Sequence, residues 1–149
     1  MKTLLFNKLQ IQAKLFSYSI FLCLILSTSV LADAKQSITL SVSLDPALQG
    51  SLQPEHTLFV YARAAQGPRM PLAIIQHKAS ELPLEVQLNA SMAMMPQMSL
   101  TQFPRVIFLA RISASGNAMT QAGDLLGQTE VVEWKKLDKP LAIVINKKH

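Results

Sequence analysis

A strict alternation of polar and apolar residues over Ser37–Leu44 constrains the fold of this 149-residue chain more than any other feature. The pattern puts four aliphatic side chains on one face at the two-residue period of a half-buried β-strand: Ile38, Leu40, Val42 and Leu44. The run Leu84–Asn89 repeats the pattern. Because no segment carries a convincing helical stripe, the sequence predicts an all-β protein.

Five further segments have the composition of short strands, which brings the expected number to about seven. They are residues 57–63, 73–77, 106–113, 129–134 and 141–145. Turn signals separate these strands at Gly67-Pro68, Ser115-Gly116-Asn117, Gly123-Asp124 and Asp138-Lys139-Pro140. About seven strands with such turns predict an immunoglobulin-like antiparallel β-sandwich, with Trp134 as a large core or edge anchor.

The N-terminal segment has the order of a secretory signal peptide. Lys2, Lys8 and Lys14 precede an apolar stretch at 15–26, and small residues follow. We expect a signal peptide at 1–32 and a single domain at 33–149, located in the periplasm. Cleavage after Ala34 and retention as a membrane anchor are the alternatives.

Removal of the signal peptide changes what the composition implies. The only cysteine, Cys23, lies in the signal, so we expect a mature domain with no disulfide and no thiolate chemistry. Three of the 14 Lys and Arg lie there too, whereas all nine Asp and Glu follow it, which leaves a net charge of about +2. The remaining cations are scattered. We therefore expect no nucleic-acid binding, and membrane contact only through partners or an uncleaved signal.

A methionine cluster is the sharpest chemical signal, with Met92, Met94, Met95 and Met98 close together. One hypothesis is a periplasmic copper-binding protein that uses these four thioethers as soft ligands for Cu(I). A second interpretation makes Met92 and Met94 core filler on one face of an extended segment. A third makes Met94, Met95 and Met98 an exposed recognition loop, because methionine adapts to varied partners. The sequence favours packing or contact over a metal, since spacing alone fixes no coordination geometry.

Arg69 stands between Pro68 and Met70-Pro71 in a conformationally restricted loop. Its guanidinium fork suits a carboxylate of a haem propionate or a peptide, so Arg69 and Met70 are partner-binding candidates. The alternative for Arg69 is a structural role through hydrogen bonds to loop carbonyls. Arg63 and Arg111, at equivalent strand ends, are expected to be structural.

Sequence motifs of catalysis are missing: there is no nucleophile elbow, His-Glu-x-x-His, glycine-rich phosphate loop or CxxC. Asp124 follows Gly123 in a turn-rich segment and is expected to close the turn. We predict a binding protein without a cofactor rather than an enzyme.

Several blocks of the sequence resemble the C-terminal immunoglobulin-like domain of bacterial c-type cytochrome biogenesis proteins of the CcmI/CycH type. The most specific are Gly67-Pro-Arg-Met-Pro-Leu-Ala73, Met92-Ala-Met-Met-Pro96, Ala110-Arg-Ile-Ser113 and Gly123-Asp-Leu125. In that family the domain is periplasmic and belongs to a membrane-anchored factor that handles apocytochrome during haem attachment. The family's membrane-spanning portion and helical tetratricopeptide repeats, to which apocytochrome holding is chiefly ascribed, have no counterpart in these 149 residues.

The resemblance implies a non-enzymatic accessory module in c-type cytochrome biogenesis. Its expected partners are cytochrome c maturation proteins or apocytochrome c. We expect recognition through the loops at 67–71 and 91–102, with no catalytic residue to carry over.

Overall fold

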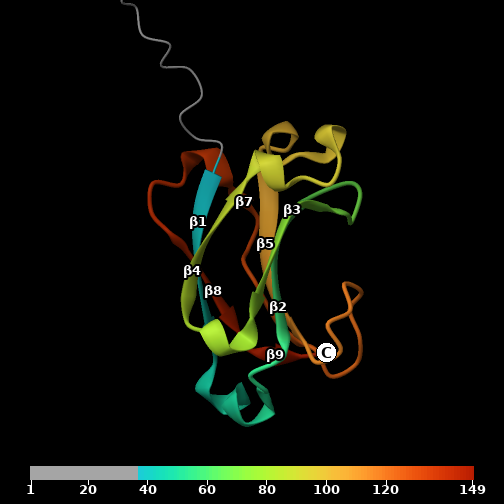
Figure 1. Cartoon of the computed structure of the whole chain (residues 1–149). Helices are drawn as coiled ribbons and strands as arrows, with labels where there is room; N and C mark the ends of the chain where they lie inside the picture. Colours follow the sequence, from blue (N-terminus) through green and yellow to red (C-terminus); the bar gives the residue numbers. More distant parts are fainter. Residues whose placement is uncertain (1–36) are drawn as a thin grey trace, which may run out of the picture. The chain divides into compact units, whose positions relative to one another are not determined.

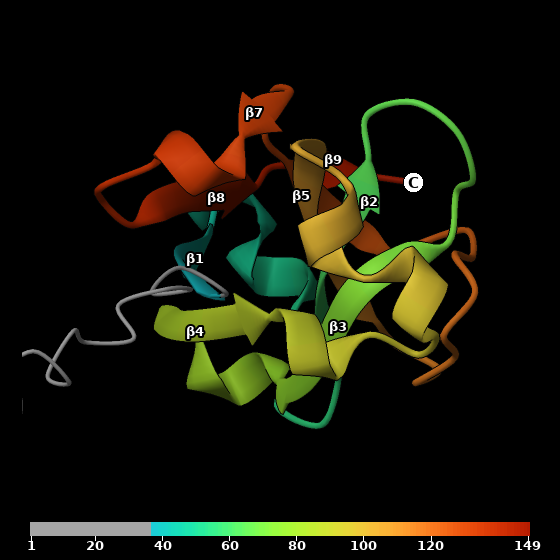
Figure 2. The ribbon, with the colours of Figure 1, turned by 90° about the horizontal axis from the view of Figure 1, so that it is seen from above.

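The computed structural model describes residues 37–149, which form nine strands and six short 3-10 turns. The strands make two sheets that pack face to face (Figure 1; Figure 2). The predicted all-β sandwich is confirmed. The predicted signal peptide at 1–32 lies outside the described residues.

Sheet A has the strand order β4-β1-β8, formed by Leu84–Asn89, Ser37–Leu44 and Leu141–Ile145. β1 pairs antiparallel with β4 and parallel with β8. The alternation that predicted β1 appears as alternating burial, because Ile38, Leu40 and Val42 are buried and the residues between them are only partly so.

Sheet B has the order β3-β2-β5-β6-β9, and the short strand β7 pairs with the start of β5. In chain order these strands are β2 Thr57–Ala64, β3 Pro71–Lys78, β5 Arg105–Ser113, β6 Leu125–Gln128, β7 Val132–Glu133 and β9 Lys147–Lys148. All pairs in this sheet are antiparallel. Alternate residues of β2 line the core, so Phe59, Tyr61 and Arg63 point away from sheet A, onto what we call the outer face.

The 3-10 turns lie in four of the connections between strands. They are η1 Pro46–Ser51, η2 Ala79–Glu81, η3 Ala90–Met92, η4 Pro96–Met98, η5 Leu100–Gln102 and η6 Trp134–Lys136. Three of the six, η3 to η5, fall in the one connection between β4 and β5.

Trp134 is fully buried, as the sequence predicted for a core anchor. It packs in the cluster that fills the space between the sheets, together with Phe108 and aliphatic residues from both. Its indole N–H donates to the Phe103 carbonyl over 3.0 Å. The ring therefore adds core volume without leaving a polar atom unsatisfied.

The C-terminal strand changes sheets at Asn146, whose N–H donates to the Leu126 carbonyl over 3.1 Å. β8 belongs to sheet A and β9 to sheet B. Gly127 permits this crossing, because a Cβ there would lie 2.8 Å from the Ile145 Cα and closer still to the Val144 carbonyl oxygen. The absence of a side chain at Gly127 thus lets the two sheets meet along this edge.

The strand predicted at 129–134 is wrong in its position. The ladder ends at Gln128, and Thr129 Oγ1 accepts the Phe108 N–H over 3.1 Å, taking a bond that a strand carbonyl would otherwise make. Only Val132–Glu133 return to the sheet as β7. Trp134 is buried in the core and begins the 3-10 turn η6 instead of continuing a strand.

Candidate recognition site

The two loops singled out by the sequence lie at the same end of the sandwich. We call residues 65–70 the arginine loop and residues 90–104 the methionine loop. The first joins β2 to β3 and the second joins β4 to β5. Figures 1 and 2 show the two loops close together, in green and in yellow to orange. The Ala65 N–H donates to the Arg105 carbonyl over 3.1 Å, which fixes the base of one loop against the end of the other.

The methionine loop is held by local hydrogen bonds and by burial. The Asn89 side chain accepts the Ser91 N–H over 3.0 Å and caps η3. The Met95 carbonyl accepts the Met98 N–H over 3.0 Å and closes η4. Leu100 is fully buried beneath these turns. The loop is thus a series of capped turns anchored to the core.

The four clustered methionines divide into two pairs. Met92 and Met98 are partly buried and pack against the core. Met94 is 73% exposed and Met95 is 39% exposed. The core-filler interpretation is therefore right for Met92 and wrong for Met94, which points into solvent because the chain turns at η3 and η4 instead of staying extended. A copper site formed by all four stays a prediction.

Arg69 and Met70 are both exposed in the arginine loop. The turn requires Gly67, whose φ of 103° lies in the left-handed region that side chains disfavour. Within residues 37–149 the Arg69 guanidinium makes no hydrogen bond or ion pair. The structural alternative for Arg69, bonds to loop carbonyls, is absent from this part of the chain.

A surface hollow of about 240 Å³ opens where the two loops meet β5. It is lined by Ala65, Gln66, Phe103, Pro104 and Arg105. Pockets for drug-sized ligands and cofactors are usually about 300–1,000 Å³. The hollow therefore suits one large side chain of a partner better than a cofactor.

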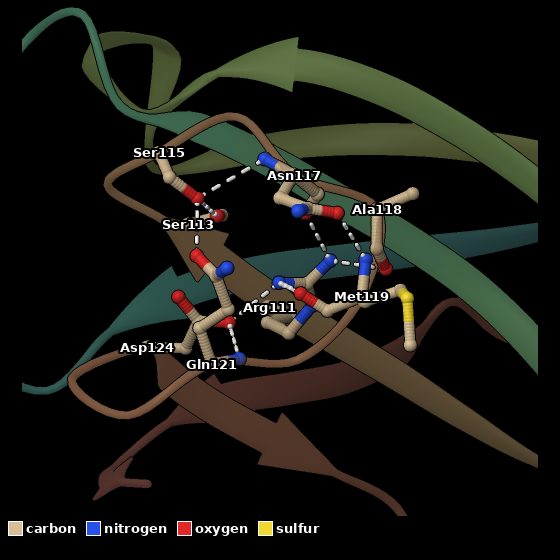
Figure 3. Close-up of polar contacts among 8 residues, drawn as sticks. All are labelled: Arg111, Ser113, Ser115, Asn117, Ala118, Met119, Gln121 and Asp124. Atoms are coloured by element: carbon tan, nitrogen blue, oxygen red, sulfur yellow. Dashed lines mark hydrogen bonds and ion pairs between the residues drawn. The ribbon is translucent and has the colours of Figure 1, made fainter.

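A network of polar contacts lies at the other end of sheet B, around Arg111 and the 114–124 loop between β5 and β6 (Figure 3). Arg111 is almost completely buried, and its Nη1 lies 2.5 Å from Asp124 Oδ2. The same guanidinium donates to the carbonyls of Asn117, Ala118 and Met119 over 2.9, 2.7 and 3.3 Å. The structural role predicted for Arg111 is confirmed.

Asp124 closes the turn, as the sequence predicted. Its carboxylate also accepts the Gln121 N–H over 2.9 Å. The Arg111 guanidinium carbon lies 4.7 Å from the centre of the Phe59 ring, a cation–π distance. The loop thus covers Phe59, which is buried although it faces away from the core between the sheets. The Arg111–Asp124 pair was not predicted, because two residues in separate segments carry no sequence signal of their contact.

Tyr61 lies on the outer face of β2, between Phe59 and Arg63. Burial raises the pKa of the Tyr61 phenol, and the nearby positive charges of Arg111 and Arg63 oppose that shift. The phenol is therefore neutral at physiological pH.

Across residues 37–149, no three His, Cys, Asp or Glu side chains gather in a way that would hold a metal ion. The same residues contain no helix with the length and apolar character of a membrane span. The described residues thus define a β-sandwich domain with two prominent loops at one end.

The family is identified by comparison with known proteins. Residues 38–146 match the family described as the cytochrome c-type biogenesis protein H Ig-like domain. This chain belongs to that family. It is 40% identical over 97 residues to the cytochrome c-type biogenesis protein CycH of Pseudomonas aeruginosa, covering 65% of this chain and 23% of that protein. The chain thus matches less than a quarter of the relative's length. No solved structure matches it.

Proposed function

We propose that this chain is a periplasmic, non-enzymatic binding module in c-type cytochrome biogenesis, and that its two loops contact an apocytochrome or another maturation protein. Family membership supports the process, since the relative from Pseudomonas aeruginosa carries cytochrome c biogenesis in its name. The signal-like order of residues 1–32 supports export to the compartment.

The exposure of Met94 and Met95 on an anchored loop is the observation that carries the binding role. Large apolar side chains left in solvent on a structured surface favour contact with a partner. The methionine thioether is flexible and polarizable, so it can pack against partners of different shape. A module that meets several maturation proteins or incompletely folded apocytochromes requires this adaptability.

Arg69 and Met70 extend the same surface. The arginine side chain is exposed and makes no polar contact within residues 37–149, so it can offer its full fork of donors to a carboxylate. The base of its loop is fixed by the bond from Ala65 to Arg105. Fixing the base reduces the conformational entropy that the loop loses on binding.

In-cell crosslinking tests the proposal. The chain, tagged at its C-terminus, is crosslinked in the envelope of its native host, purified and analysed by mass spectrometry. We expect enrichment of cytochrome c maturation proteins or apocytochromes. We also expect the doubly substituted Met94→Ser, Met95→Ser chain to lose most of that enrichment.

The matched control is Met119→Ser. Met119 is 76% exposed, similar to Met94, but it belongs to the 114–124 loop. This variant should retain the partners. Recovery of only unrelated envelope proteins by the unsubstituted chain would contradict the proposed process. If the doubly substituted Met94→Ser, Met95→Ser chain recovered the partners as well as the Met119→Ser chain does, the proposed surface would be contradicted.

A further inference from the structure

Every arginine of the chain lies on sheet B or in its loops: Arg63 in β2, Arg69 in the arginine loop, and Arg105 and Arg111 in β5. Arg111 is committed to Asp124 and three carbonyls. The other three guanidinium groups make no hydrogen bond or ion pair within residues 37–149. These three, Arg63, Arg69 and Arg105, are what we call the open arginines.

The register of sheet B brings Arg63 and Arg105 to one end of the outer face, and Arg69 lies in the loop that leaves β2 at this end. Arg63 lies opposite Ile107, and the Ala65 N–H bonds the Arg105 carbonyl, so Arg63 and Arg105 are diagonal neighbours. Both point away from sheet A, because the next residue on each strand, Ala64 after Arg63 and Val106 after Arg105, lines the core. Diagonal neighbours of this kind have Cα atoms about 7–8 Å apart, within reach of one bound group. Arg69 stands two residues before Pro71, which pairs with Arg63.

The local charge is mainly positive. Glu133 lies opposite Arg105 in the β7 pairing. Its carboxylate is bound by Lys136 Nζ at 2.5 Å, and the pKa of Glu133 is lowered mainly by this hydrogen bond and to a smaller degree by the nearby charge of Arg105. Glu133 interacts with both Lys136 and Arg105, but one carboxylate does not balance Lys136 and the three open arginines, so this corner keeps an excess positive charge. A partner anion would relieve their mutual repulsion.

The hollow beside the open arginines selects among anions. Arg105 is one of its lining residues, and Ala65, Phe103 and Pro104 supply apolar surface. A nucleic-acid backbone or a bare phosphate offers the charge but has no apolar side chain for the hollow. An acidic peptide segment offers both, with a carboxylate for the guanidinium forks and an apolar side chain for the space beside them.

We propose that the open arginines and the adjoining hollow bind an extended acidic segment of a polypeptide, in which glutamate or aspartate flanks a large apolar side chain. The inference rests on the proposed function, because it gives the chemistry of the partner segment at that surface. The exposed Met94 and Met95 then contact the partner beyond this segment.

Peptide binding by the full chain tests the inference. The probe is a fluorescently labelled synthetic peptide in which two glutamates flank a Leu-Phe pair, and the matched probe carries glutamine in place of both glutamates. Affinity is measured by fluorescence anisotropy at low and at physiological salt. We expect the glutamate peptide to bind more tightly, with the difference shrinking as salt rises.

Single substitutions locate the site. Arg63→Gln, Arg69→Gln and Arg105→Gln should each weaken binding of the glutamate peptide about fivefold, the equivalent of losing one partly exposed ion pair of about 1 kcal/mol. Lys148→Gln removes the same charge from an exposed residue of β9 at the other end of sheet B, and should leave binding unchanged. Thermal unfolding of each variant checks that the fold is kept.

The inference would be overturned by failure of the glutamate peptide to bind, by equal affinity for both peptides, or by arginine variants that bind as the unsubstituted chain does. A single-stranded oligonucleotide that binds more tightly with the same arginine dependence would also overturn it. The in-cell crosslinking separates the two proposals. If maturation proteins are captured equally by the arginine variants, the acidic-segment site is wrong and the proposed function stands. If the peptide binds through the arginines and no maturation protein is captured, the proposed function is wrong.

Discussion

Two neighbouring strands of sheet B carry the same Ala-Arg pair, but the two arginines differ in burial and in polar contacts. Ala62-Arg63 stands near the end of β2 and Ala110-Arg111 near the end of β5, and a glycine with positive φ follows each, Gly67 at 103° and Gly116 at 71°. Arg111 is buried, and each of its two terminal guanidinium nitrogens makes two hydrogen bonds. Arg63 is only partly buried and makes no polar contact of its side chain within residues 37–149.

The difference lies in whether each loop places an acidic residue beside its arginine. The 114–124 loop ends in Asp124, whose carboxylate pairs with Arg111. The arginine loop contains no acidic residue and adds a further cation, Arg69. Arg111 therefore holds a loop in place, whereas Arg63 makes no polar contact within residues 37–149. We propose that the same local motif serves stability at one end of the sheet and recognition at the other.

The largest expected effect comes from breaking the buried pair. Arg111→Ala leaves Asp124 buried without its cation and removes the donors of three loop carbonyls, so the free energy of unfolding should fall by about 3–5 kcal/mol. Arg63→Ala, which loses no polar contact within the described residues, should stay within about 0.5 kcal/mol of the unsubstituted chain. Urea unfolding monitored by Trp134 fluorescence measures both. Similar losses for the two variants would show that the comparison is wrong.

The methionine loop allows a smaller test of the same contrast. Met98→Ala removes a side chain that packs against the core, and should cost about 1–2 kcal/mol because the site is only partly buried. Met94→Ala alters an exposed side chain and should cost less than about 0.5 kcal/mol. The midpoint of urea unfolding, at unchanged m, reports both values. A larger loss for Met94 would place it in the core and remove the basis of the recognition surface.

An acidic residue added to the arginine loop should make the surroundings of Arg63 resemble those of Arg111, which has Asp124 beside it. Gln66 lines the hollow together with Arg105, so Gln66→Glu places a carboxylate beside the open arginines. Stability should rise by no more than about 1 kcal/mol, as for an exposed ion pair. Binding of the glutamate peptide should weaken, because the site now holds its own anion. Gln87→Glu, on an exposed position of β4 in sheet A, is the control and should change neither property.

The smallest expected effect is on Tyr61, which faces both arginines. Burial raises the pKa of Tyr61 above its ordinary value, so stability is fully present below the pKa of an unfolded tyrosine and is lost as pH rises through the folded value. Arg63→Gln removes a charge that lowers this pKa, and should raise it further. Tyrosinate absorbance in a Tyr18→Phe background, where Tyr61 is the only tyrosine, measures the change. An unchanged or lowered pKa would show that Arg63 does not face Tyr61.

Residues with a local signal were predictable from the sequence, and residues whose role depends on a distant partner were not. The alternation in β1 and the apolar run in β5 predicted both strands closely. The run at 129–134 failed because Thr129 and Trp134 make side-chain bonds to Phe108 and Phe103, which the local pattern does not reveal.

The candidate site follows the same rule. Arg69 and the methionine cluster stood out by composition, whereas the contribution of Arg63 and Arg105 emerges only from the register between β2 and β5. The division of the methionines into Met92 and Met98 against Met94 and Met95 likewise depends on where η3 and η4 turn the chain.

Site-specific photocrosslinking in the envelope of the native host tests the central claim most directly. A photoreactive amino acid replaces Gln66 at the open end in one chain and Gln87 in sheet A in another, and the captured proteins are identified by mass spectrometry. We expect the Gln66 position to capture cytochrome c maturation proteins or apocytochromes, and the Gln87 position to capture neither. Capture of these proteins at Gln87 alone, or equally at both positions, would contradict it.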